Sequence, residues 1–113
     1  MVMIINVNFD DVIKEALEAA RAVATQNWDQ LRDIVENVAK GLENDTVFLA
    51  KKKASGEFNE DDARVYLEDQ KMLARVRLRS LAIVTLQLAE RIWNAIAEVF
   101  RRAIKTALGW TIL

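Results

Sequence analysis

One helix-breaking segment at the middle of the chain constrains the fold most, because the 113 residues include no proline and only three glycines. This segment, KKKASGEFNEDDA (residues 51–63), runs from three lysines through Gly56 to an asparagine and three acids. Gly56 suits the left-handed position after a helix, and the lysines complement the negative end of the helix dipole. Asn59 suits an N-cap, with acids in the first turn that follows. The segment therefore predicts a helix end, a short loop and a helix start.

Apolar residues at spacings of three and four continue far on both sides of this loop and predict two helical arms. Asn8 suits the cap of the first arm, and Gly109 suits the end of the second. Within the first arm, Gly41 and Asn44–Thr46 form the weakest stretch, where a break is most expected. The segment MIINVNF (residues 3–9) has the residue types of a short strand. We expect a single helical domain over residues 1–113, with arm one at about 9–53, the loop at about 54–59, arm two at about 60–108, and apolar tails at 1–8 and 109–113.

Two arms of similar length around one short loop predict an all-α fold built on a long antiparallel helical hairpin. Each arm would span roughly 70 Å as a continuous helix. In the simplest register, Lys51–Lys53 face Glu60–Asp62, while the arginines at 75–79 lie near Asp33 and Glu36. Opposite charges on the two arms favour this pairing, and Glu90 is expected to pair with Arg91, Lys14 or an arginine of another subunit.

The second arm is apolar around too much of its circumference for one partner helix to cover it. We therefore predict self-association, in which two hairpins form a four-helix-type bundle. A break in the first arm near Asn44–Thr46 would instead allow a three-helix monomer to cover part of this surface. The expected oligomer or core face consists of Leu81, Leu88, Ile92, Ile96, Val99, Ile83, Leu86, Trp93, Phe100 and Ile104.

The C-terminal region offers an alternative use for this apolar surface. Basic residues beside aromatic and aliphatic ones are typical of a helix that lies on a membrane surface. The expected partner or membrane tail consists of Arg101, Arg102, Lys105, Trp110, Ile112 and Leu113. The interrupting charges in the most apolar window, residues 81–100, argue against a membrane-spanning helix.

Composition excludes several classes of site, since the chain has neither cysteine nor histidine. Thiolate chemistry, histidine-based zinc sites and Ser-His-Asp arrangements cannot form from this chain alone. A carboxylate metal bundle around Glu90 would lack the usual Glu-x-x-His motifs, and the acidic stretch 57–62 lacks EF-hand spacing. The basic stripe Lys71, Arg75 and Arg79 has no groove-reading motif beside it. We assign no catalytic, cofactor-binding or metal-binding residue.

These observations predict a non-catalytic structural or protein-interaction module rather than an enzyme. Its expected partner is itself, as a homodimer or higher oligomer, or another helical protein. A net charge of −1 gives no general attraction to nucleic acid. No secretory signal pattern is evident. The sequence leaves the compartment open, with a cytoplasmic location favoured and a peripheral membrane location as the alternative.

Overall fold

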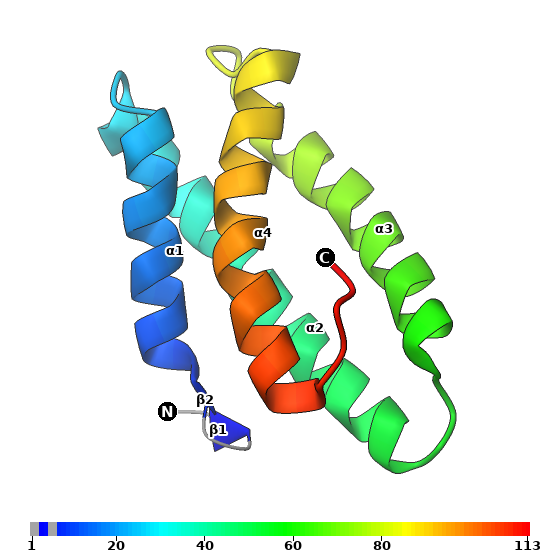
Figure 1. The fold of residues 1–113 in the computed structure, drawn as a ribbon. Coiled ribbons are helices and arrows are strands. Elements are labelled where there is room, and N and C mark those ends of the chain that lie inside the picture. The colour runs from blue at the N-terminus through cyan, green and yellow to red at the C-terminus, as the bar shows by residue number, and fades with distance from the viewer. Residues whose placement is uncertain (1–2, 5–6) are drawn as a thin grey trace.

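Four helices dominate the computed structural model of the chain, which describes residues 3–4 and 7–113. This confirms the predicted all-α class (Figure 1). A two-stranded antiparallel ribbon precedes the helices, with Met3 opposite Asn8 and Ile4 opposite Val7. The elements are β1 (Met3–Ile4), β2 (Val7–Asn8), α1 (Phe9–Val23), α2 (Trp28–Ala54), α3 (Glu60–Leu78) and α4 (Leu86–Leu108).

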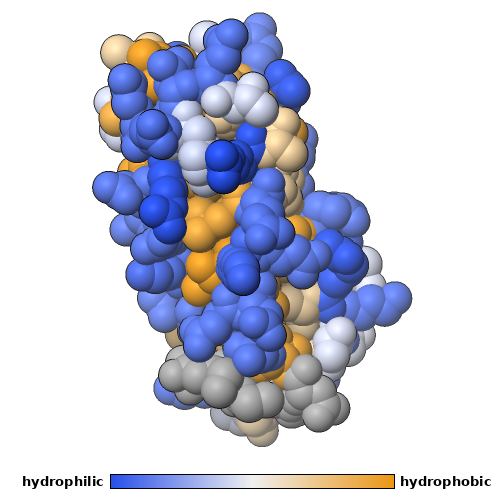
Figure 2. Space-filling view, turned by 90° about the vertical axis from the view of Figure 1, so that its left-hand side faces the viewer, coloured by the Kyte–Doolittle hydropathy of each residue, from blue (hydrophilic) through white to orange (hydrophobic). Residues whose placement is uncertain are grey.

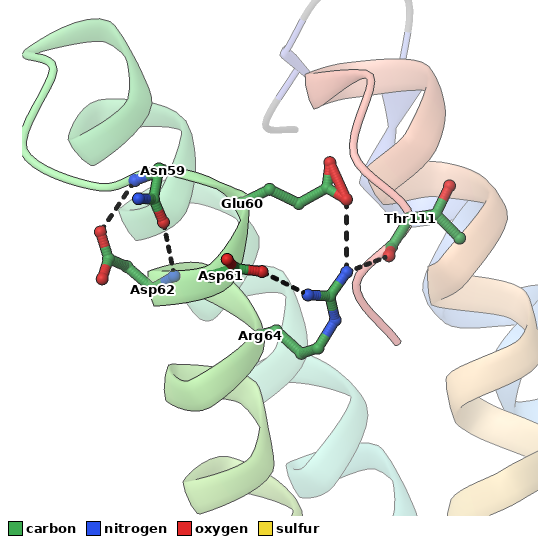
Figure 3. Close-up of polar contacts among 6 residues, drawn as sticks. All are labelled: Asn59, Glu60, Asp61, Asp62, Arg64 and Thr111. Carbon is green, nitrogen blue, oxygen red and sulfur yellow. Dashed lines mark hydrogen bonds and ion pairs between the residues drawn. The ribbon is translucent and has the colours of Figure 1, made fainter.

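The helix boundaries that carry strong local signals lie where the sequence predicts them. The Asn8 side chain accepts a hydrogen bond from the backbone N–H of Asp10 at 3.0 Å. Gly56 and Gly109 both adopt positive φ, at 77° and 75°, as expected of residues that follow a helix. Asn59 and Asp62 form a reciprocal capping box at the start of α3, with hydrogen bonds of 2.8 and 3.0 Å (Figure 3).

The first arm is not one helix, because the chain leaves the helical path at residues 24–27 between α1 and α2. Asn27 has a φ of 63°, a left-handed conformation that asparagine tolerates better than most residues. The expected weak point is wrong, since α2 runs unbroken through Gly41 and Asn44–Thr46. The Thr46 hydroxyl is buried and donates to the Leu42 carbonyl at 2.8 Å, so its polar group is satisfied within the helix.

The second arm is also divided, by a connection at residues 79–85 between α3 and α4. Ile83, Val84 and Thr85 are consecutive β-branched residues, which lose side-chain freedom in a helix. Thr85 adopts an extended conformation and its hydroxyl accepts from the Leu88 backbone N–H at 3.1 Å, which caps α4. The chain can therefore reverse here without glycine or proline.

Helix α4 occupies the centre of the molecule and packs against each of the other three helices (Figure 1). Helices α1 and α3 flank it on opposite sides, and α2 crosses behind it. The molecule measures 42 × 25 × 18 Å, so two uninterrupted 70 Å arms are replaced by a shorter, thicker arrangement. Phe9, Phe100, Leu31, Ile92 and Ile96 are among the largest fully buried side chains of the core.

The charge pairs differ from those expected for a simple hairpin. Lys52 pairs with Glu57 at 2.8 Å, whereas Glu60 and Asp61 pair with Arg64 of their own helix. Lys53 instead reaches across to the end of α4, where its ammonium group donates to the Leu108 carbonyl. For Lys52, Glu60 and Asp61 the reason is local, because each meets a partner within five residues along the chain before it can meet the facing helix.

The C-terminal segment 109–113 folds back into the space between α3 and α4 (Figure 1). Arg64 donates from one guanidinium nitrogen to the Thr111 carbonyl at 3.3 Å (Figure 3). Arg101 donates to the Leu113 oxygen at 2.7 Å, and Ile112 is buried. The segment is therefore hydrogen-bonded to both α3 and α4.

Candidate interaction surface

The residues predicted to form an oligomer or core face on the second arm lie mainly inside the single chain. Because α1, α2 and α3 pack against α4, most of its apolar residues find partners without a second molecule. The reason for expecting a second copy over α4 is therefore removed. Of the ten predicted residues, Ile92, Trp93, Ile96, Val99, Phe100 and Ile104 are buried, Leu81 and Leu88 are half-buried, and Ile83 and Leu86 are exposed.

The residues predicted to form a partner or membrane tail are divided between interior and surface. Ile112 is buried, while Trp110, Leu113 and Arg101 are half-buried. Arg102 and Lys105 are exposed, and Arg102 pairs with Glu15 of α1 at 2.9 Å. No helix in the described part of the chain has the length and hydropathy needed to cross a membrane. The apolar side chains expected to enter lipid are thus largely packed within the protein.

Among the residues whose exposure the structure describes, 7–113, the large apolar side chains that remain exposed gather in one region, which runs from α3 to the first residue of α4. The most exposed are Val76, Val65 and Met72, at 69%, 64% and 61%. We call this region the α3 surface; it consists of Val65, Met72, Leu73, Val76, Ile83 and Leu86. A clustered set of exposed apolar side chains, unlike scattered ones, is typical of a contact with another molecule.

The position of the α3 surface follows from the geometry of α3. Ala63, Leu67, Ala74 and Leu78 are buried against α2 and α4. At about 100° per residue, Val65, Met72 and Val76 project from the opposite side of the helix. Helix α3 therefore carries large apolar side chains on two opposite sides, of which the fold covers only one.

A shallow depression of about 400 Å³ lies at the centre of this surface, lined by Met72, Arg75, Val76, Arg79 and Leu86. Arg75 is held at its edge by an ion pair with Glu90 of α4. The expectation that Glu90 pairs with Arg91, Lys14 or another subunit is wrong, because α3 brings Arg75 closer. Two members of the predicted basic stripe, Arg75 and Arg79, thus border an apolar depression.

The opposite side of the molecule, which α1 forms, differs in character. Figure 2 shows a mainly hydrophilic surface there, with a narrow hydrophobic strip between polar side chains. Helix α1 places its buried Phe9, Ala16 and Ala20 toward the interior and its charged residues outward. Only the α3 side therefore presents large apolar side chains that are mostly exposed within the described residues.

A polar cluster joins α2 to α3 beside this surface. The Tyr66 hydroxyl donates to the Asp45 carboxylate at 3.0 Å. Burial raises the pKa of Asp45, against the lowering effects of the Tyr66 hydrogen bond and the charge of Arg77. The pKa of Tyr66 is raised to about 12, mainly by burial and to a smaller extent by the hydrogen bond to Asp45 and the negative charge of that residue. The ring of Tyr66 stacks on Phe48 with centroids 4.9 Å apart, so the cluster fixes the angle between the two helices.

Other site classes have little support in the structure. Within the described residues, no group of three or more acidic side chains could hold a metal ion. The Arg75 Nε atom lacks a well-directed hydrogen bond, although Glu90 supplies an opposite charge. Neither protein-family models, nor curated proteins, nor solved structures match this chain. The α3 surface is thus the feature on which a functional proposal can rest.

Most of this surface was not predicted from the sequence, although a signal was present. Val65, Met72 and Val76 were obscured by the charged residues between them, because α3 is polar overall. Their spacing of seven and four residues is that of one side of a helix. The positions of Leu67, Ala74 and Leu78 satisfy the same spacing on the other side, so periodicity alone does not reveal which side is covered.

Proposed function

We propose that this chain is a non-catalytic protein-interaction module that binds a protein partner through the α3 surface. The single observation that supports this proposal is that, within residues 7–113, the large exposed apolar side chains are confined to residues 65–86. Val76, Met72 and Leu86 border one depression, so their removal from water on binding would be concerted. The sequence predicts self-association through the residues of α4. Under this proposal, the contact surface lies on α3 instead.

The α3 surface has the composition of an interaction site rather than of a catalytic one. Its depression is bordered by aliphatic side chains and two arginines. Arginine and methionine are enriched in protein interfaces. A helix that presents an apolar stripe typically binds a groove or another helix.

A photo-reactive amino acid at position 76 tests this function. Val76 is replaced by a benzophenone-bearing residue, and the same residue replaces Ala22 on α1 as a matched exposed control. Irradiation of the purified protein and of cells that express it should give discrete protein adducts from position 76 alone. Mass spectrometry then identifies the partner, whether a second copy or another protein. Equal adducts from both positions, or none from position 76, would contradict the proposal.

A further inference from the structure

We propose that the partner of the α3 surface is a second copy of this chain, docked with the two α3 helices antiparallel. This inference rests on the proposed function and specifies its partner. Val65, Asp69, Met72, Val76 and Arg79 follow one another at spacings of four, three, four and three residues. Alternating steps of four and three are those of a coiled-coil seam, which one helix presents to another. The seam lies on the side of α3 that the fold leaves uncovered.

The charges in this seam select an antiparallel arrangement. When two copies are aligned about the midpoint between Met72 and Val76, Asp69 of one copy faces the partner's Arg79. Two-fold symmetry forms this pair twice, once at each end of the apolar centre. A parallel arrangement would place Asp69 on Asp69 and Arg79 on Arg79, which like-charge repulsion disfavours.

Both charged residues are free to make this contact. Asp69 and Arg79 are exposed. Within the described part of the chain, neither takes part in an ion pair of the folded monomer. Arg75, by contrast, is engaged by Glu90 and does not add an uncompensated charge beside the two-fold axis.

The apolar centre is complementary in the same alignment. Met72 of each copy faces the partner's Val76, and the depression beside Val76 offers a place for that flexible methionine side chain. Leu73 lies on one flank and meets its own copy near the axis. Val65 lies toward the partner's connecting segment, where Ile83 is exposed. The contact spans about four turns of helix, so we expect a reversible dimer at the small end of the interface range.

Charge reversal tests the register directly. Asp69→Arg and Arg79→Asp are prepared singly, together in one chain, and as a mixture of the two single variants. Each single variant places like charges opposite each other, and should dimerise about tenfold more weakly or worse. The double variant and the equimolar mixture restore opposite charges in both pairs, and should recover most of the parental affinity. Sedimentation equilibrium over roughly micromolar to millimolar protein gives the dissociation constants. Thermal melts confirm that each variant is folded.

Engineered cysteines give an independent measurement, because the natural chain contains none. Mixing Met72→Cys with Val76→Cys should yield a disulfide-linked heterodimer on mild oxidation, at several times the yield of either variant alone. A parallel pair would instead link Met72→Cys to itself. That outcome would overturn the antiparallel arrangement.

The results also separate this inference from the function on which it rests. A chain that stays monomeric at millimolar concentration, yet forms photo-adducts with another protein from position 76, overturns the second copy and leaves the interaction module intact. Single charge variants that dimerise as the parent does overturn the proposed register. An absence of any contact at position 76 overturns both.

Discussion

Helices α3 and α4 use apolar residues in opposite ways. Helix α4 is apolar around most of its circumference, and three neighbouring helices bury nearly all of that surface. Helix α3 is far more polar, yet it leaves Val65, Met72 and Val76 in water. The amount of apolar surface on a helix therefore does not by itself identify an interface. The number of covering neighbours, which depends on where the chain turns, decides which apolar surface remains exposed.

A charge on the buried side of α4 should have the largest effect on stability in this comparison. Ile92 is fully buried, and Ile92→Asp places a carboxylate where no partner is available. We expect a loss of about 3–5 kcal/mol in the free energy of unfolding, which is enough to unfold much of the population. Urea denaturation followed by circular dichroism measures it. A variant as stable as the parent would show that α4 is not enclosed as described.

The polar link between α2 and α3 should have the next largest effect. Tyr66→Phe leaves the half-buried Asp45 carboxylate without its hydroxyl donor, at a cost of about 1–2 kcal/mol. The double variant with Asp45→Ala should lose less than the sum of the two single changes, because each single change removes the same contact. Chemical denaturation of the parent, the two single variants and the double variant gives the four unfolding free energies of this double-mutant cycle. Strictly additive losses would contradict an interaction between the two side chains.

The same tyrosine gives a pH dependence. Because the pKa of Tyr66 is raised to about 12 in the folded state, its contribution is complete below the ordinary value near 10. Stability should fall as the pH rises from about 10 to 12, since ionisation is easier in the unfolded chain. Tyr66→Phe should remove this part of the alkaline loss. An unchanged alkaline profile would assign the loss to other groups.

Loss of the capping box at the start of α3 should have a smaller effect. Asn59→Ala removes the side chain that accepts from the Asp62 backbone N–H, at about 1 kcal/mol. Differential scanning calorimetry should show a melting temperature lower by several degrees for a chain of this size. Asn59→Ser, which can accept the same hydrogen bond, should restore most of the difference. Failure of that rescue would indicate a role other than capping.

The smallest effect on folding is expected on the outer side of α3. Val76→Asp should change the unfolding free energy by less than about 1 kcal/mol, because the side chain is already mostly in water. The same substitution should abolish association at the α3 surface. The same kind of change, an aliphatic residue to aspartate, is thus compared on the exposed side of α3 and on the buried side of α4, at Ile92. Melting curves measure the stability of each variant, and sedimentation measures its association. A large drop in stability would mean that Val76 is part of the core.

Local signals made part of this fold predictable from the sequence. Asn59 with Asp62, Gly56 and Gly109 determine helix boundaries through contacts within a few residues, so the loop and the helix ends were found. The connections at 24–27 and 79–85 were missed, because neither contains glycine or proline. Their causes are weaker: a left-handed Asn27 in one, and β-branched residues before a threonine cap in the other.

The candidate site was less predictable than the fold. Exposure of Val76 depends on the directions of α2 and α4, which no short stretch of sequence encodes. The surplus of apolar surface on the second arm was recognised, but it was assigned to a partner molecule. Once the chain turns at residues 79–85, α1 and α2 cover α4, and the uncovered surface moves to α3.

The close packing of α1 on α4 has a consequence for biosynthesis. These are the first and last helices, so ribosomal synthesis completes α1 long before its main neighbour exists. Until then the apolar side of α1, which includes Ala16 and Ala20, has no cover except α2. We therefore expect the nascent chain to be most prone to aggregation in the interval before α4 emerges from the exit tunnel.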